Sequence, residues 1–216
     1  RLRAGDALAM GDRAAAAEDA AGLASVRADL APLAGRLLDQ AVDARAIAAV
    51  ISAVTRDLTA RAAAIAEASM LADGAGPAPA AYTVLVLGSA GRGEALLVPD
   101  QDNALVHAGR DSDDPWFAEL GRRMCRLLND AGIPFCQGGV MASNAAWRHA
   151  AEDWRDRVRD WIAHPEGDNM LNADIFFDMM PVFGDKVLGV DLKAFALNHA
   201  RHAPHFLHAM TRDLDD

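Results

Sequence analysis

The stretch Gly88 to Asn103 reads GSAGRGEALLVPDQDN and decides the fold of this chain. It follows an apolar, partly β-branched segment, Tyr82 to Leu87, which predicts a buried strand ending at the Gly-Ser pair. A second strand is predicted from Asp102 to His107. Further along the chain, predicted strands and helices alternate loosely, and this alternation is typical of a mixed α and β domain.

The chain before this stretch predicts helices. Residues 1–75 are rich in alanine, and larger apolar residues recur there at helical spacing. Asp73-Gly74 gives a stop signal, and the Gly- and Pro-rich segment 74–79 predicts a linker. We therefore expect two or three antiparallel helices over residues 1–75 and a separate domain over residues 76–216. The helical positions are Leu30, Leu33, Leu37, Leu38, Ile47, Val50, Ile51, Val54, Leu58 and Ile65.

The chain after the second strand predicts one clear helix and two short strands. Asp114-Pro115 reads as an N-cap followed by proline at the first helical position, and the helix is expected to end near Gly132. Short strands are predicted at residues 133–135 and 140–142. Ser143-Asn144 is expected to cap a further helix.

Three tryptophans recur at intervals of seven in that further helix: Trp147, Trp154 and Trp161. Such a stripe favours core packing over a cofactor stack. A last strand is predicted over Ile175 to Phe183, and a final helix over Lys186 to His199.

Composition limits the class of protein. The 216 residues are 52% hydrophobic, enough for one domain with a core and an accessory element. No apolar run reaches membrane-spanning length, so we expect a cytoplasmic protein without a membrane partner. The net charge of −10 argues against a broad nucleic-acid surface, which needs clustered Lys and Arg. Cys125 and Cys136 lie among apolar residues without CxxC spacing, which predicts two core thiols and no redox or zinc site.

The glycine-rich turn suits phosphate. Gly88-Ser89 at a strand end and Gly91-Arg92 close behind it offer backbone N–H groups and a guanidinium. Glycine turns beside an arginine are common, so the turn alone is a weak signal.

Acidic residues strengthen that signal. Residues i and i+2 of an extended chain share a face, about 6.6 Å apart, so Asp100 and Asp102 can direct both carboxylates at one site. Two hard oxygen donors beside phosphate suit Mg²⁺, although an isolated Asp-x-Asp is more often a solvated turn. A two-metal site needs a further carboxylate, for which Asp174 and Asp178 share a face of the last predicted strand. Asp178 is the better candidate because an unpaired carboxylate in its apolar surroundings would be costly.

The segment GSAGRGEALLVPDQDNAL resembles the DUF294 family of nucleotidyltransferases, within the polymerase-β-type superfamily. It is similar to the PII-protein uridylyltransferase and the glutamine synthetase adenylyltransferase. Three further segments resemble the same family: residues 23–71, GGVMASNAAWR at 138–148 and LNADIFFDMMPVFGD at 171–185. The resemblance implies an α+β nucleotidyltransferase fold, in which a small mixed sheet is flanked by helices and preceded by a helical hairpin or bundle.

The resemblance also implies roles for the residues of the turn. Gly88 and Ser89 would hold the β and γ phosphates of a nucleoside triphosphate, within a nucleotide-binding turn that includes Gly91. Arg92 would steady the triphosphate, and Glu94 is expected to pair with Arg92.

For the acidic residues, the resemblance implies metal binding and catalysis. Asp100 and Asp102 would bind Mg²⁺ or Mn²⁺, and Asp178 would be the third carboxylate, helping to activate the attacking hydroxyl. The implied reaction transfers a nucleoside monophosphate to a hydroxyl of a protein or small molecule, in signal transduction. The acidic composition favours such an acceptor over a nucleic-acid end.

The family tends to place cyclic-nucleotide-binding or CBS modules before the transferase and helices after it. We therefore expect residues 76–216 to be a transferase domain truncated at its C-terminal end, within a longer parent. Two alternatives stay open. One is a nucleotide-sensing regulatory module without turnover, which is compatible with Met180 and with the expected truncation. Met180 stands where the family has Arg, and Pro99 where it often has Ser or Thr. The other is an interaction scaffold built on the alanine-rich helices.

Overall fold

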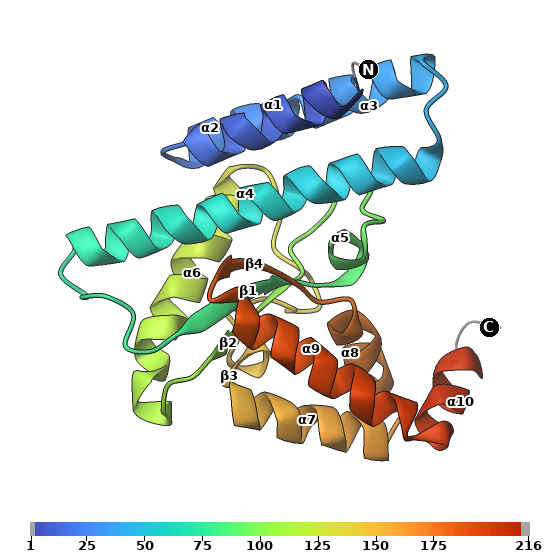
Figure 1. The fold of residues 1–216 in the computed structure, drawn as a ribbon. Helices are drawn as coiled ribbons and strands as arrows, with labels where there is room; N and C mark the ends of the chain where they lie inside the picture. The colour runs from blue at the N-terminus through green and yellow to red at the C-terminus, as the bar shows by residue number, and fades with distance from the viewer. Residues whose placement is uncertain (1–2, 213–216) are drawn as a thin grey trace.

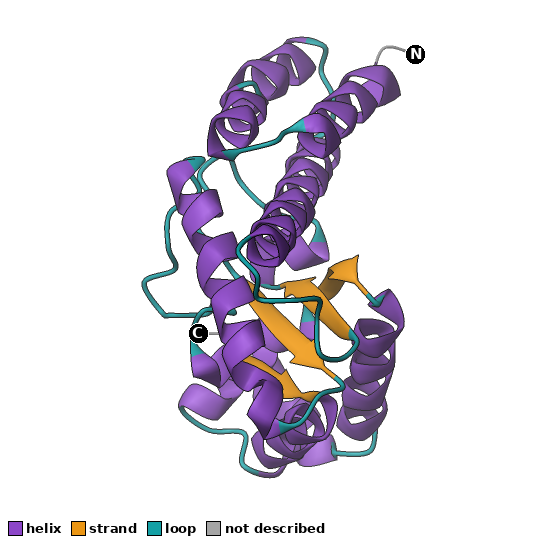
Figure 2. Ribbon diagram, turned by 90° about the vertical axis from the view of Figure 1, so that its left-hand side faces the viewer, coloured by secondary structure: helices purple, strands orange, loops and turns teal. Residues whose placement is uncertain are grey.

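The computed structural model describes residues 3–212 and shows an α+β fold in three layers (Figures 1 and 2). A four-stranded sheet in the order β3-β2-β1-β4 lies between two layers of helices. β1 pairs antiparallel with both β2 and β4, while β2 and β3 are parallel. The predicted small mixed sheet flanked by helices is therefore confirmed. The strands are β1 (Tyr82–Val86), β2 (Asn103–His107), β3 (Arg148–Ala150) and β4 (Met180–Gly184).

The N-terminal layer is a bundle of four helices, one or two more than the sequence pattern predicts. The additional breaks coincide with aspartates that cap new helices: the side chain of Asp19 accepts a hydrogen bond from Gly22 N at 2.8 Å. The fourth helix ends where predicted, before Gly74, whose φ of 84° suits glycine. The helices are α1 (Arg3–Ala16), α2 (Ala20–Ala28), α3 (Leu30–Asp39) and α4 (Ala44–Ala72).

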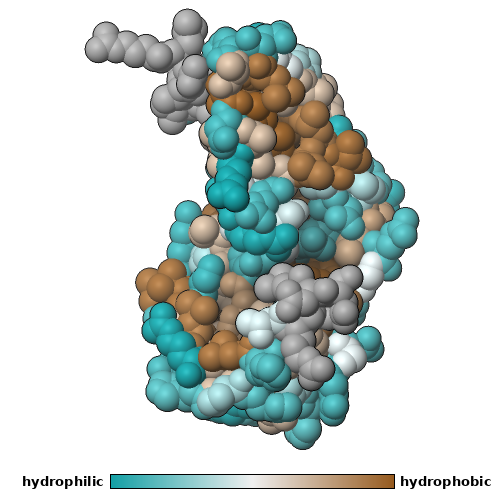
Figure 3. Space-filling view, turned by 90° about the vertical axis from the view of Figure 1, so that its right-hand side faces the viewer, coloured by the Kyte–Doolittle hydropathy of each residue, from teal (hydrophilic) through white to brown (hydrophobic). Residues whose placement is uncertain are grey.

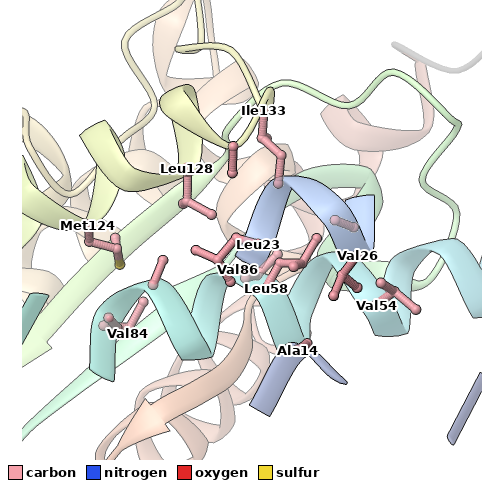
Figure 4. Packing of buried hydrophobic residues seen from close by; sticks show 14 of the residues in the cluster. Ala14, Leu23, Val26, Val54, Leu58, Val84, Val86, Met124, Leu128 and Ile133 are labelled. Atoms are coloured by element: carbon pink, nitrogen blue, oxygen red, sulfur yellow. The ribbon is translucent and has the colours of Figure 1, made fainter. Parts of the chain in front are cut away.

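One hydrophobic cluster joins this bundle to the sheet. Figure 4 shows side chains from α2, α4, β1 and α6 (Asp114–Asp130) gathered in it. Strand side chains alternate between faces, so Val84 and Val86 of β1 enter this cluster while Leu85 and Leu87 enter a second one. The alternation in one strand thus connects both helical layers to the sheet.

The second cluster fills the opposite face of the sheet. Trp147, Trp154 and Trp161 are all buried in it, with adjacent ring centroids 6.1 and 6.2 Å apart, so the core-packing prediction is confirmed. The indole of Trp154 also donates a hydrogen bond to the carbonyl oxygen of Leu105 at 3.0 Å, fixing this layer to β2. The helices of this side are α7 (Ala151–Ala163), α8 (Asp168–Phe177), α9 (Lys186–Arg201) and α10 (Pro204–Arg212).

Two strand predictions are wrong, and a third, Ile175 to Phe183, is confirmed only from Met180 onward. Residues 133–135 and 140–142 form an irregular segment beside β2. Residues 175–177 are the last turn of α8, and only from Met180 does the chain become β4. A short apolar run fits a buried strand and a buried helix equally well, and tertiary packing decides between them. Asn144 caps a short 3₁₀ helix, Ala145–Trp147, and β3 separates it from α7.

The predicted helix after Asp114 is confirmed as α6, and a second 3₁₀ turn, Asp111–Asp113, precedes it. Within residues 3–212, no helix combines the length and the apolar character needed to cross a membrane.

Because α4 is the helix of the bundle that packs on the sheet and on α6, its buried leucine should be costly to truncate. Leu58 is fully buried, whereas Leu71 of the same helix is 59% exposed. We expect Leu58→Ala to lower the free energy of unfolding by about 2–5 kcal/mol and Leu71→Ala by less than about 0.5 kcal/mol. Denaturant-induced unfolding followed by circular dichroism measures both values. Equal losses in the two variants would contradict the layered packing.

Candidate functional site

The candidate site lies at the end of β1, because both of its neighbours begin there. Val86 is opposite Asn103 of β2 on one side and Met180 of β4 on the other. The segments that enter these strands carry Asp102 and Asp178. The topology therefore brings two acidic residues, remote in sequence, to the two sides of the turn that follows β1.

That turn is the start of the short helix α5 (Gly88–Arg92), and two glycines allow it to fit. Gly88 has a φ of 53°, and a Cβ there would lie 2.8 Å from Oδ2 of Asp102. A Cβ on Gly91 would collide with the carbonyl oxygen of Asp178. The first N–H groups of a helix lack intrahelical partners, so the Gly88-Ser89 turn offers donors beside a carboxylate.

The four residues Asp100 to Asn103 divide into two pairs by alternation. Gln101 and Asn103 are buried, each only 2% exposed. Asp100 is exposed and Asp102 is half-buried. Residues of an extended chain point alternately to opposite sides, so the amides anchor the segment and the carboxylates share the other side. The predicted convergence of the two carboxylates is thereby explained by the burial of their neighbours.

The buried amides hold the segment 131–142 against β2. Gln101 Nε2 donates to the carbonyl oxygen of Ile133 at 2.9 Å. Asn103 Oδ1 accepts from the backbone N–H of Ala142 at 2.8 Å. The sequence pattern assigned these two residues no role, although both amides alternate with the two aspartates in the DQDN motif.

A third donor lies beside the two carboxylates. One ligand atom from each of Asp100, Asp102 and Cys136 lies within 4.8 Å of the other two, the only such group of three or more His, Cys, Asp or Glu within the described part of the chain. Cys125 is a buried core thiol as predicted, whereas Cys136 is half-buried and packs against the second hydrophobic cluster. No local spacing connects Cys136 to the aspartates, because the fold alone brings them together.

The two carboxylates form an electrostatically strained pair. Burial raises the pKa of Asp102 to about 6, and the charge of Asp100 adds to the effect. A divalent cation between the two carboxylates would relieve their repulsion. It would also stabilise the negative charge of Asp102 in place of the water that burial excludes. Two oxygen donors of this kind fit Mg²⁺ or Mn²⁺, which take carboxylates together with water and phosphate oxygens.

Arg92 and Asp178 form an ion pair across the other side of the turn. Arg92 Nε also donates to Glu94 Oε2 at 2.8 Å, so the predicted pairing of Glu94 with Arg92 is confirmed. Asp178 is the C-cap residue of α8 and not a mid-strand residue, and Asp174 lies exposed one helical turn earlier. Asp178 is not a member of the three-donor group, and its role as a metal ligand stays a prediction.

An apolar groove is formed by the segment that precedes the two aspartates in the sequence. Residues 95–98, immediately before Pro99 and Asp100, pack beside α3 and α4 around a groove of about 470 Å³. Leu96 and Val98 are 75% and 79% exposed. Figure 3 views the molecule from the side where α3 leads into α4. Hydrophobic surface is visible there over the N-terminal layer of helices.

The comparison with protein families agrees with this geometry. A family model described as "Putative nucleotidyltransferase DUF294" matches residues 28–168. The match contains the glycine turn and both aspartates of the Asp-Gln-Asp motif, and it ends before Asp178. The search of curated proteins found no match. Since the family model covers well over half of the chain, this protein belongs to the DUF294 family of nucleotidyltransferases.

Proposed function

We propose that this protein is a metal-dependent nucleotidyltransferase that moves a nucleoside monophosphate from a nucleoside triphosphate to a hydroxyl of a protein or small molecule. The observation that carries the proposal is the close approach of the Asp102 carboxylate to Gly88, where it leaves no room for a Cβ, in a chain of a nucleotidyltransferase family. A phosphate-binding turn and a pair of carboxylates are the two parts that such a reaction needs in one place.

The turn would bind the triphosphate. Gly88 and Ser89 offer backbone N–H groups to the β and γ phosphates, and Gly91 lets α5 approach closely enough for this contact. Arg92 uses Nε and Nη1 for Glu94 and Asp178, and a guanidinium has five N–H donors. Its remaining donors can steady the phosphates while both carboxylates hold its orientation.

Asp100 and Asp102 would hold Mg²⁺ or Mn²⁺, and Asp178 is the sequence-based candidate for a third carboxylate. The metal, when bound, neutralises phosphate charge and favours deprotonation of the attacking hydroxyl. The acceptor oxygen bonds to the α-phosphorus, the bond from that phosphorus to the bridging oxygen breaks, and pyrophosphate leaves with the electron pair. The proton of the hydroxyl passes to a carboxylate of the site.

The surface supports a protein or small-molecule acceptor. A polynucleotide needs clustered positive charge, and the chain carries a net charge of −10. The apolar groove at residues 95–98 is formed by the segment that precedes Asp100 in the sequence, and it offers an acceptor an apolar surface. We further propose a role in signal transduction, like that of the PII-protein uridylyltransferase. CBS or cyclic-nucleotide-binding modules would then flank the transferase in a longer parent protein.

A nucleotide-sensing module without turnover is the second candidate. The observation that favours it is the Arg92–Asp178 ion pair, which engages the predicted phosphate-binding arginine and the predicted third carboxylate with each other. In that case the triphosphate binds the same turn, and its occupancy is transmitted to neighbouring modules.

Transfer should depend on the paired carboxylates. We expect Asp100→Asn and Asp102→Asn each to lower transfer from labelled nucleoside triphosphate on the order of 100-fold, because charge stabilisation is lost at the reacting phosphate. Asp174→Asn, an exposed carboxylate one turn before Asp178, is the matched control and should retain the rate. The assay supplies Mg²⁺ or Mn²⁺ and candidate protein and small-molecule acceptors, and follows pyrophosphate release.

Undiminished transfer by Asp102→Asn would overturn the enzymatic proposal. Tight nucleotide binding in calorimetry, with no pyrophosphate released under any metal or acceptor, would favour the sensing module.

Asp178→Asn distinguishes two roles for that residue. A metal ligand would lose Mn²⁺ affinity as Asp102→Asn does. The ion pair leads us to expect instead that Mn²⁺ affinity changes less than about twofold while nucleotide affinity falls roughly tenfold, because Arg92 loses its orientation. Calorimetric titrations of Mn²⁺ and of nucleotide measure the two affinities separately. A loss of Mn²⁺ affinity equal to that of Asp102→Asn would establish Asp178 as a ligand.

The raised pKa of Asp102 predicts how metal-free stability depends on pH. The folded protein holds this proton up to a pH of about 6, whereas the unfolded chain releases it near the model value of 3.8. The free energy of unfolding should therefore fall as pH rises from about 4 to about 6. Asp102→Asn should reduce this decline and stabilise the chelator-treated protein at pH 8 by roughly 1–2 kcal/mol, allowing for partial exposure. Thermal unfolding at pH 4 and pH 8 tests this, and a destabilised variant at pH 8 would contradict it.

A further inference from the structure

Cys136 reaches the two carboxylates from a separate part of the chain. Its sulfur lies within 4.8 Å of one oxygen of Asp100 and one of Asp102. The thiol is half-buried. Three donor atoms thus converge from two chain segments. They meet at the pair of aspartates where the proposed function requires a metal.

The position of the thiol is fixed by backbone hydrogen bonds. Gln101 N donates to the carbonyl oxygen of Pro134 at 3.0 Å, before the cysteine. Gly139 N donates to the carbonyl oxygen of Cys136 itself at 3.1 Å, closing a turn, and Asn103 N donates to that of Val140 at 3.0 Å. The residues that alternate with the two aspartates therefore also hold the segment on both sides of the sulfur.

We propose that Cys136 is the third protein ligand of this metal site and sets its metal preference. Mg²⁺ takes oxygen donors, whereas a thiolate favours softer ions such as Co²⁺, Zn²⁺ and Cd²⁺. A site with two carboxylates and one thiolate binds these ions through sulfur and oxygen, and binds Mg²⁺ through the carboxylates alone. The inference rests on the proposed function for the metal-binding role of Asp100 and Asp102.

The chain has two cysteines, which gives a matched pair of variants. In Cys125→Ala the only thiol is at the site, and in Cys136→Ser the only thiol is in the core. Cd²⁺ or Co²⁺ is titrated into each protein, and thiolate-to-metal charge-transfer absorption in the near ultraviolet is recorded. We expect the band to appear in the unmodified protein and in Cys125→Ala, to saturate at one equivalent and to be absent in Cys136→Ser.

Calorimetry adds a second readout. Cd²⁺ affinity should fall at least roughly tenfold in Cys136→Ser, while Mg²⁺ affinity should change less than about twofold. Cys136→Ala, checked for folding by its thermal transition, controls for any ligation by the serine hydroxyl. A band that persists in Cys136→Ser, no band in the unmodified protein, or equal losses of Cd²⁺ and Mg²⁺ affinity would overturn the inference.

Transfer activity measured in parallel with Mg²⁺ separates this inference from the proposed function. Transfer that depends on Asp102, without any sulfur band, would reject Cys136 as a ligand and leave the transferase intact. A sulfur band that requires Asp102, without transfer or pyrophosphate release, would support the metal site and reject the transferase.

Discussion

The antiparallel pairing of β1 with both of its neighbours is the constraint on which the site depends. Because β2 and β4 start where β1 ends, the residues that lead into them meet around the Gly88 turn. Asp102 approaches this turn from one side and Asp178 from the other. The alternating side chains of β1 enter both hydrophobic clusters, so the layers that stabilise the sheet also fix the turn in place.

The segment Asp100 to Asn103 combines anchoring and chemistry by the same alternation. The side chains of Gln101 and Asn103 form hydrogen bonds with the neighbouring loop, so the two carboxylates lie together on the opposite side of the segment. The loop that the amides hold carries Cys136 to the carboxylates. Removing solvent from Asp102 raises its pKa, which makes a cation the natural partner of the pair.

Local patterns predicted the local parts of this structure. Helical spacing identified α3, α4 and α6, and apolar runs identified β1 and β2, since each reads directly as a period or a strand. The apolar run around Asp178 was predicted as a strand, although such a run fits a helix equally well. Tertiary packing makes residues 175–177 helical. Cys136 had no spacing to reveal it, since its approach to Asp102 depends on the hydrogen bonds of Gln101 and Asn103. The pair of aspartates was therefore predictable from the sequence, whereas the position of Cys136 beside them could be found only from the fold.

The central claim is that the Gly88 turn and the Asp100–Asp102 pair form one site for metal and nucleotide. The most direct measurement is the affinity of a non-hydrolysable nucleoside triphosphate with and without Mn²⁺, by calorimetry. Binding free energies of two ligands at one site are coupled reciprocally. The account predicts that Mn²⁺ strengthens triphosphate binding and that Asp102→Asn abolishes this strengthening. Equal triphosphate affinity with and without Mn²⁺ in the unmodified protein would contradict it.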